Sequence, residues 1–395
     1  MLFSDMPYVR PDLDLLRAKI HERVEELKAA KTFAQADAAY AALEKVFSGV
    51  DTAGALCYIR HSIDTEDEFY MAEKAFMDEA APQLQQIRQD AQLALYGSPW
   101  RPDFEKKYGA LLFTNMEIQL GSFDPKLIPD MQEENKLTTA YAKLIASAQI
   151  PFEGQVLNLA QLGPYKESTD PAMRRKAWLA QAGFYTEHQQ ELDDIYHKLA
   201  ALRTKMGRAM GYENYVPLGY DRMGRNCYTE ADVKKFREAI VDYVVPVADR
   251  LYREQAKRLG VEYPLSYADT TPMFLSGNPN PRGTADDILL AGKKFYHELS
   301  RETAAFIDVM FQNELMDVLS RKGKEGGGYC TGIPDYQVPF IFANFNGTQH
   351  DVEVLTHEGG HAFAGYTARD IFPMELQSPT LESCEIHSMS MEFFA

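Results

Sequence analysis

The chain has 395 residues, of which 45% are hydrophobic and 25% charged, and its formal net charge is −17 at pH 7. This balance is typical of a folded globular protein with a large buried core. An acidic surface is repelled by nucleic acids and by anionic membranes, so we expect neither as a partner. No apolar run reaches the roughly 18 residues of a membrane span, so we expect no membrane protein.

The cysteines indicate a reducing compartment. Cys57, Cys227, Cys330 and Cys384 lie far apart and form no C-x-x-C pair. This spacing speaks against a disulfide framework or a zinc knuckle, and free thiols are typical of the cytoplasm. The N-terminus carries neither the basic nor the apolar segment of a signal peptide. We therefore expect a cytoplasmic protein.

The first 145 residues predict a helical region. Apolar residues recur every three or four positions from Leu13 to Leu27, which is the pattern of an amphipathic helix. Further helices are expected over about 34–47, 53–63, 65–97 and 103–147, with a break at 121–125 in the last of these ranges. The helix after Thr65 begins with a capping-box pattern and should bury Phe69 and Leu93.

Residues 146–395 mix helices with short strands. Apolar residues on both sides of Glu153-Gly154 predict a hairpin within 148–162. Helices are expected over about 170–210, 229–260 and 284–322, with a polar loop at 267–284. Tyr196 in the first of these helices is expected in the core, and Pro246 should kink the second.

The strongest functional signal is the run His357-Glu358-Gly359-Gly360-His361. Residues four apart share a helix face, so the two imidazoles can hold one metal ion. Glu358 projects beside the same site and could take a proton from a metal-activated water. A plain surface helix explains this run poorly, because each mid-helix glycine costs about 1 kcal/mol relative to alanine. We expect the glycines to let another element approach the metal closely.

A catalytic zinc needs a third protein ligand. Ala364 and Thr367 occupy the positions where metzincins carry glycine and histidine, so that class is excluded. The remaining source is a later glutamate. The candidates are Glu375, Glu382, Glu385 and Glu392.

The spacing of these glutamates suggests different roles. Glu375 is expected in a loop, whereas Ser378-Pro379 should begin a helix that carries the other three. Glu385 and Glu392 are seven positions apart and share a face. One of them could bind the metal while the other orients a ligand. Asp351 is expected to cap the helix of the metal motif.

The motif, followed by the segment 385–392, resembles the oligoendopeptidase F and thimet oligopeptidase family of zinc metallopeptidases. Segments 326–330 and 340–347 are similar to the oligoendopeptidase F branch. The resemblance covers about 140–395 well and the N-terminal helices more loosely. It implies that His357, His361 and Glu385 bind one Zn²⁺, that Glu358 is the general base, and that Glu392 supports a ligand. It also implies oligopeptide substrates.

Chains of that family continue well beyond the glutamate helix, and their last part supplies a channel wall and residues thought to stabilise the oxyanion. This sequence stops at Phe393-Phe394-Ala395 without a helix stop signal. We therefore expect a fragment, or a chain that a second polypeptide completes. No oxyanion-stabilising residue is assigned.

A strand is expected over 338–345, and Pro339 near its end is typical of an edge strand. An edge strand beside the metal could hydrogen-bond an extended peptide, so Phe342, Ala343 and Asn344 are predicted to bind substrate. The alternative is a strand that only packs.

These observations predict a mostly α, multi-helix peptidase fold with a small β-sheet next to the HExxH helix. We expect an N-terminal helical region, 1–145, and a catalytic region, 146–395. The predicted function is zinc-dependent endopeptidase activity on short peptides. A helical zinc carboxypeptidase and a non-catalytic, zinc-stabilised peptide-binding fragment remain the alternatives.

Overall fold

A computed structural model describes residues 1–395. Helix accounts for 69% of the chain, which confirms the predicted mostly α fold. The helices are α1 (Leu13–Ala29), α2 (Phe33–Ile63), α3 (Glu68–Tyr96), α4 (Arg101–Tyr108), α5 (Ala110–Gly121), α6 (Ile128–Ala146), α7 (Gly163–Lys166), α8 (Pro171–Glu187), α9 (Gln189–Ala209), α10 (Val216–Arg222), α11 (Glu230–Ala239), α12 (Val245–Leu259), α13 (Ala285–Leu299), α14 (Arg301–Gln312), α15 (His350–Ala368) and α16 (Leu381–Phe394). The strands are β1 (Ile150–Phe152), β2 (Gln155–Leu157), β3 (Met316–Leu319), β4 (Tyr329–Ile333) and β5 (Val338–Phe345).

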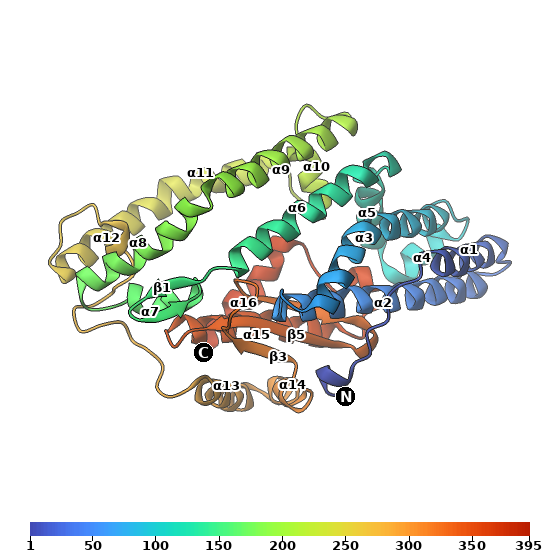
Figure 1. Cartoon of the computed structure of the whole chain (residues 1–395). Helices are drawn as coiled ribbons and strands as arrows, with labels where there is room; N and C mark the ends of the chain where they lie inside the picture. The colour runs from blue at the N-terminus through green and yellow to red at the C-terminus, as the bar shows by residue number, and fades with distance from the viewer.

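The N-terminal helices α1 to α5 pack around one apolar core (Figure 1). Its fully buried side chains include Leu27, Leu43 and Phe104. The predicted burial of Phe69 and Leu93 is wrong: the two side chains are 55% and 54% exposed. They lie on the outer side of α3, since tertiary packing sets which stripe of a long helix faces inward.

The predicted break between 47 and 53 is also wrong, because α2 runs unbroken through Gly49. This stretch of α2 is held by the turn that follows β4. Ser48 Oγ donates to Asp335 Oδ1 at 2.7 Å, and the Asp335 backbone N–H donates to Thr52 Oγ1 at 2.8 Å. Tertiary contacts of this kind offset the low helix propensity of a single glycine.

The middle of the chain forms an arm of long helices above the sheet, with α8, α9, α11 and α12 along its upper side (Figure 1). The hairpin β1–β2 has the expected turn, where Glu153 and Gly154 both have positive φ. The predicted helix over 170–210 is two helices that meet at His188. Tyr196 is 77% exposed, so its predicted burial is wrong. Before Pro246 the helix changes to a π-helical segment, Ile240–Val244, which interrupts the regular α-helical hydrogen bonding there. The predicted kink itself stays a prediction.

The helix expected over 284–322 is shorter and divided. Ser300 ends α13 and caps α14 through a capping box with Thr303. The chain then turns at Glu314, which has a positive φ of 54°, and enters β3. A four-residue strand is hard to separate from a helix end by periodicity alone.

The three-stranded sheet has the order β3-β5-β4, with β5 parallel to β3 and antiparallel to β4. One face packs on α15, where Leu355 joins Ala343 in a core cluster. The opposite face packs on α2, where Ser62 Oγ lies 2.6 Å from Tyr329 Oη. Helices therefore cover both faces of the sheet.

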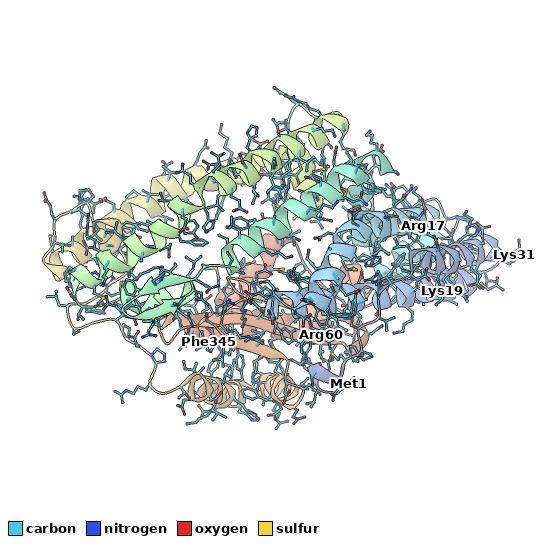
Figure 2. The ribbon with its side chains drawn as sticks, viewed as in Figure 1. Met1, Arg17, Lys19, Lys31, Arg60 and Phe345 are labelled. Atoms are coloured by element: carbon cyan, nitrogen blue, oxygen red, sulfur yellow. The ribbon has the colours of Figure 1, made fainter.

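Hydrogen bonds from α2 hold the N-terminal segment in place. Arg60 Nη2 donates to the carbonyl oxygens of Phe3 and Met6 at 3.1 and 2.6 Å. The Met1 amine donates to Asn313 Oδ1 at 2.8 Å, and Figure 2 labels both Met1 and Arg60.

None of the helices is both long and apolar enough to cross a bilayer. The division at residue 145 stays a prediction.

Two glutamates, Glu44 and Glu375, meet where α2 contacts the connection between α15 and α16. Glu44 is 5% exposed, and its Oε2 accepts the Met374 backbone N–H at 3.2 Å. Burial, then the neighbouring Glu375 carboxylate, raise the pKa of Glu44 to about 8. Burial also raises the pKa of Glu375.

We expect the free energy of unfolding to fall between about pH 5 and pH 8 because of Glu44. A raised folded-state pKa means that the folded protein binds the proton more tightly, so this stabilisation is complete below pH 4.5 and is lost as the pH rises to about 8. Tyr40, Asp51, Arg88 and Glu375 are its titratable neighbours. Urea unfolding of the wild type and of Glu44→Gln should show a smaller loss in the variant. Equal losses would exclude this carboxyl as the cause.

Candidate metal centre

The two helices that carry the proposed ligands pack directly against each other. Asp351 lies inside the first turn of α15, and its carboxylate accepts the N–H groups of Asn346 and Gly347 at 2.9 and 2.7 Å. The expected cap therefore binds the connection from β5, and Gln349 occupies the N-cap position. Likewise α16 begins at Leu381, three residues after the predicted Ser378 cap.

The glycines of the motif allow the close approach that the sequence predicts. A Cβ on Gly360 would lie 2.6 Å from Ser388 Cα and 2.7 Å from the His387 carbonyl oxygen, both in the backbone of α16. A Cβ on Gly359 would lie 2.0 Å from Tyr296 Oη. Each distance is shorter than a non-bonded contact allows, so a side chain at either position would push a neighbour away. The helix tolerates two glycines because α13 and α16 occupy the space beside them.

Three candidate ligands converge at this contact. The rings of His357 and His361 lie 4.9 Å apart. Glu385 Oε2 lies 3.2 Å from His357 Nε2 and 3.6 Å from His361 Nε2. One donor atom from each residue falls within 4.8 Å of the other two. Two imidazoles and one carboxylate are a donor set that suits Zn²⁺.

The other glutamate candidates lie elsewhere. Glu392 Oε1 lies 2.6 Å from His357 Nδ1, on the far side of the ring from Glu385, so it fixes the ring orientation. Glu382 pairs with Arg225, whose Nε lies 2.8 Å from Glu382 Oε1. Glu375 lies beside Glu44. Only Glu385 therefore joins the two histidines.

Glu358 lies on the floor of a groove of about 1150 Å³ that also exposes the two histidines and Glu385. The side chain of Glu358 is buried, and its pKa is raised to about 7. Burial is the main cause, Glu385 adds to the increase, and His357 opposes it. A carboxyl group with a pKa near neutrality can both accept and release a proton at physiological pH. It lies outside the group of three donors, so it is free for this role.

The predicted substrate contacts of β5 need a correction. Phe342 and Ala343 are 1% and 0% exposed, and β5 is the central strand with a partner on each side. The Asn344 side chain donates to the carbonyl oxygens of Glu325 and Gly327 at 2.8 Å each. Pro339 fits a central strand because it precedes the first residue of β5 that pairs with β3, so no partner needs its missing N–H.

The free edge beside the metal belongs to β4. The Ile341 N–H donates to Leu315 on the β3 side, so Phe340 and Phe342 point their backbone groups toward β4. Their partners there are Thr331 and Tyr329. The intervening residues, Cys330 and Gly332, therefore direct their N–H and C=O groups away from the sheet, and both line the groove.

Several residues at the site went unnoticed in the sequence. Ser388 is fully buried and donates to Glu385 Oε2 at 3.0 Å, which a spacing of three on a helix could have indicated. His387 lines the groove with its ring 5.8 Å from that of His361. Gly328 lies beside the general base candidate, since a Cβ there would be in ordinary contact with Glu358 Oε1 at 3.5 Å. Nothing local in the sequence indicates that last contact.

The chain is similar to known peptidases in both sequence and fold. Residues 3–123 match the Peptidase M3 N-terminal domain, and residues 294–395 match Peptidase family M3. A solved putative oligoendopeptidase F is 45% identical over 100% of this chain and 70% of its own, with a TM-score of 0.98. PZ peptidase A with an inhibitor is 44% identical over 99% and 69%, with a TM-score of 0.97. A putative oligoendopeptidase F from Bacillus anthracis str. Ames is 44% identical over 100% and 72%, with a TM-score of 0.98. No curated protein sequence matches the chain.

The fold and these matches define a peptidase. The chain belongs to peptidase family M3, the oligoendopeptidase F and thimet oligopeptidase family of zinc metallopeptidases. It spans about 70% of the length of the solved oligoendopeptidase structures.

Replacing Glu385 by alanine should weaken zinc retention by about 100-fold, because one of three ligand donors is lost. Glu382→Ala is the matched control on the same helix, since Glu382 pairs with Arg225 instead of facing the histidines. Competition with a fluorescent zinc chelator measures both affinities. Loss of zinc from the Glu382 variant alone would show that the third ligand is misassigned.

Proposed function

We propose that this protein is a zinc-dependent endopeptidase that hydrolyses short peptides. The observation that carries the proposal is the convergence of His357, His361 and Glu385 beside the buried Glu358, in a groove bordered by the free edge of β4. The two imidazoles and the Glu385 carboxylate would hold the ion. Bound zinc would lower the pKa of a water molecule and polarise the scissile carbonyl.

The residues of the chain supply the remaining steps. An extended peptide pairs through its main chain with Cys330 and Gly332, which aligns a scissile bond in the groove. Glu358 accepts a proton from the attacking water and then delivers it to the leaving amine. Glu392 holds the His357 ring, and Ser388 holds the Glu385 carboxylate, so both ligands are oriented before substrate binds.

The direct test is hydrolysis of an internally quenched peptide whose two ends are blocked. We expect cleavage that a chelator abolishes and that added Zn²⁺ restores, with the zinc content measured separately by atomic absorption. Cleavage that persists in the zinc-free protein would refute the proposal.

The same assay separates the two alternatives from the proposal. A carboxypeptidase would release single residues from a free C-terminus and would leave the blocked peptide intact. A non-catalytic fragment would bind the peptide, as fluorescence anisotropy would show, without cleaving it even when fully loaded with zinc.

A further inference from the structure

A second cavity, of about 660 Å³, opens on the other side of the β4 edge from the metal groove. It lies between α2 and α3, and its floor includes Thr331, Gly332 and Pro334. The same three residues also line the metal groove. The two spaces therefore meet along the free edge that the proposed peptide would occupy.

The geometry of strand pairing directs alternate side chains of a bound peptide into these two spaces. Side chains along an extended strand point to opposite faces in turn. On β4, Thr331 lines the cavity under α2, whereas Cys330 faces the metal side. Glu358 lies close to Cys330, since burial and, to a smaller extent, the charge of Glu358 raise the pKa of the Cys330 thiol. A peptide paired with this edge would place every second side chain on the α2–α3 side.

The cavity has apolar walls and a charged interior. The side chains of Phe47, Leu84 and Phe123 form part of the wall. Arg88 Nη2 donates to both carboxylate oxygens of Asp51, at 2.7 and 2.9 Å, and its guanidinium lies over the Phe47 ring. Because Arg88 is already paired with Asp51, it forms no ion pair with Glu44 or Glu375.

Glu375 supplies an acidic group that has no salt-bridge partner. It is one of the residues that line the cavity, and its Oε2 atom is buried without a hydrogen-bond partner. The adjacent Glu44 is a buried acid, and its Oε2 already accepts the Met374 N–H. A buried carboxylate without a donor is costly, and a ligand cation that reaches it would satisfy it.

We propose that this cavity is a substrate subsite for a basic side chain, arginine or lysine, and that Glu375 pairs with its cationic head. The inference rests on the proposed function, because the peptide bound along β4 delivers the side chain. Arginine and lysine combine an apolar stem with a cationic head, which matches apolar walls around an acidic interior. An acidic side chain would meet Glu375 and Glu44, and a purely apolar one would leave Glu375 Oε2 unpaired.

The test uses end-blocked peptides in which one arginine is moved from position to position, each compared with a peptide carrying citrulline there. Citrulline has nearly the same shape without the charge. At one position the wild type should prefer arginine by about tenfold in kcat/KM, the effect of one charge-assisted hydrogen bond. In Glu375→Gln this ratio should fall toward one, whereas Glu79→Gln, on the exposed side of α3 and paired with Lys136, should keep it.

Binding measured in Glu358→Gln separates this inference from the proposed function, because it requires no turnover. The arginine peptide should bind that variant about tenfold more tightly than the citrulline peptide, and adding Glu375→Gln should remove the difference. Equal affinities at every position would overturn the basic subsite even if the enzyme cleaves peptides. An unchanged arginine preference in Glu375→Gln would overturn the role of Glu375. Thermal melting of each variant verifies that it is folded.

Discussion

Glu358→Gln should reduce the kcat for peptide hydrolysis by about three orders of magnitude or more while zinc stays bound. The amide has the shape of the carboxylate but cannot accept the proton of the attacking water, and general base catalysis contributes about 10²–10⁴ in rate. Zinc should remain because Glu358 lies outside the three-donor group. Hydrolysis of the quenched peptide and the zinc content per chain, measured on one preparation, give both quantities.

Glu353→Gln is the control for this substitution. Glu353 lies on α15 five residues earlier, with its side chain 52% exposed and near His350. It should cleave the peptide at the wild-type rate. A Glu358→Gln enzyme with undiminished activity would show that another group takes the proton.

Gly360→Ala should destabilise the protein by about 2–3 kcal/mol and weaken zinc binding by more than tenfold. The added Cβ overlaps the backbone of α16 at Ser388 and His387, and backbone atoms cannot move aside as a flexible side chain can. Relief requires α16 to move away from α15, which carries Glu385 away from the two histidines. Denaturant unfolding with and without zinc, together with chelator competition, measures the two effects.

Gly365→Ala is the matched comparison on the same helix. A Cβ there meets nothing within 4 Å, so the substitution should stabilise α15 by about 1 kcal/mol, the usual gain of alanine over glycine in a helix. Zinc affinity should not change. If the two variants behaved alike, close packing of α16 could not explain the glycines of the motif.

The local parts of the site could be predicted because they depend on helix periodicity. A spacing of four brought His357 and His361 together, and a spacing of seven placed Glu385 and Glu392 on one side of a later helix. The spacing alone did not show which of these two glutamates binds the metal. That depends on how α16 crosses α15, which a sequence pattern does not encode. The assignment of Glu385 as the ligand came from the family resemblance.

The sheet shows where local reasoning fails. The strand 338–345 was predicted, but its place in the sheet depends on β3, a strand that was hidden in a predicted helix. With β3 on one side and β4 on the other, β5 has no free edge, and Phe342 packs against Tyr329 with ring centroids 4.8 Å apart. Pro339 suggested an edge strand, although the structure shows only that the ladder to β3 begins after it.

The free edge of β4 has a consequence for the state in which substrates are recognised. Cys330 and Gly332 offer only main-chain groups, so a partner must present several consecutive residues with unpaired N–H and C=O groups. Residues in a helix or inside a sheet have already used these groups. Under the proposed function, the rate at which a folded protein is cut should therefore follow the population of its locally unfolded segments. Such an enzyme would select its targets by their conformational stability as well as by their sequence.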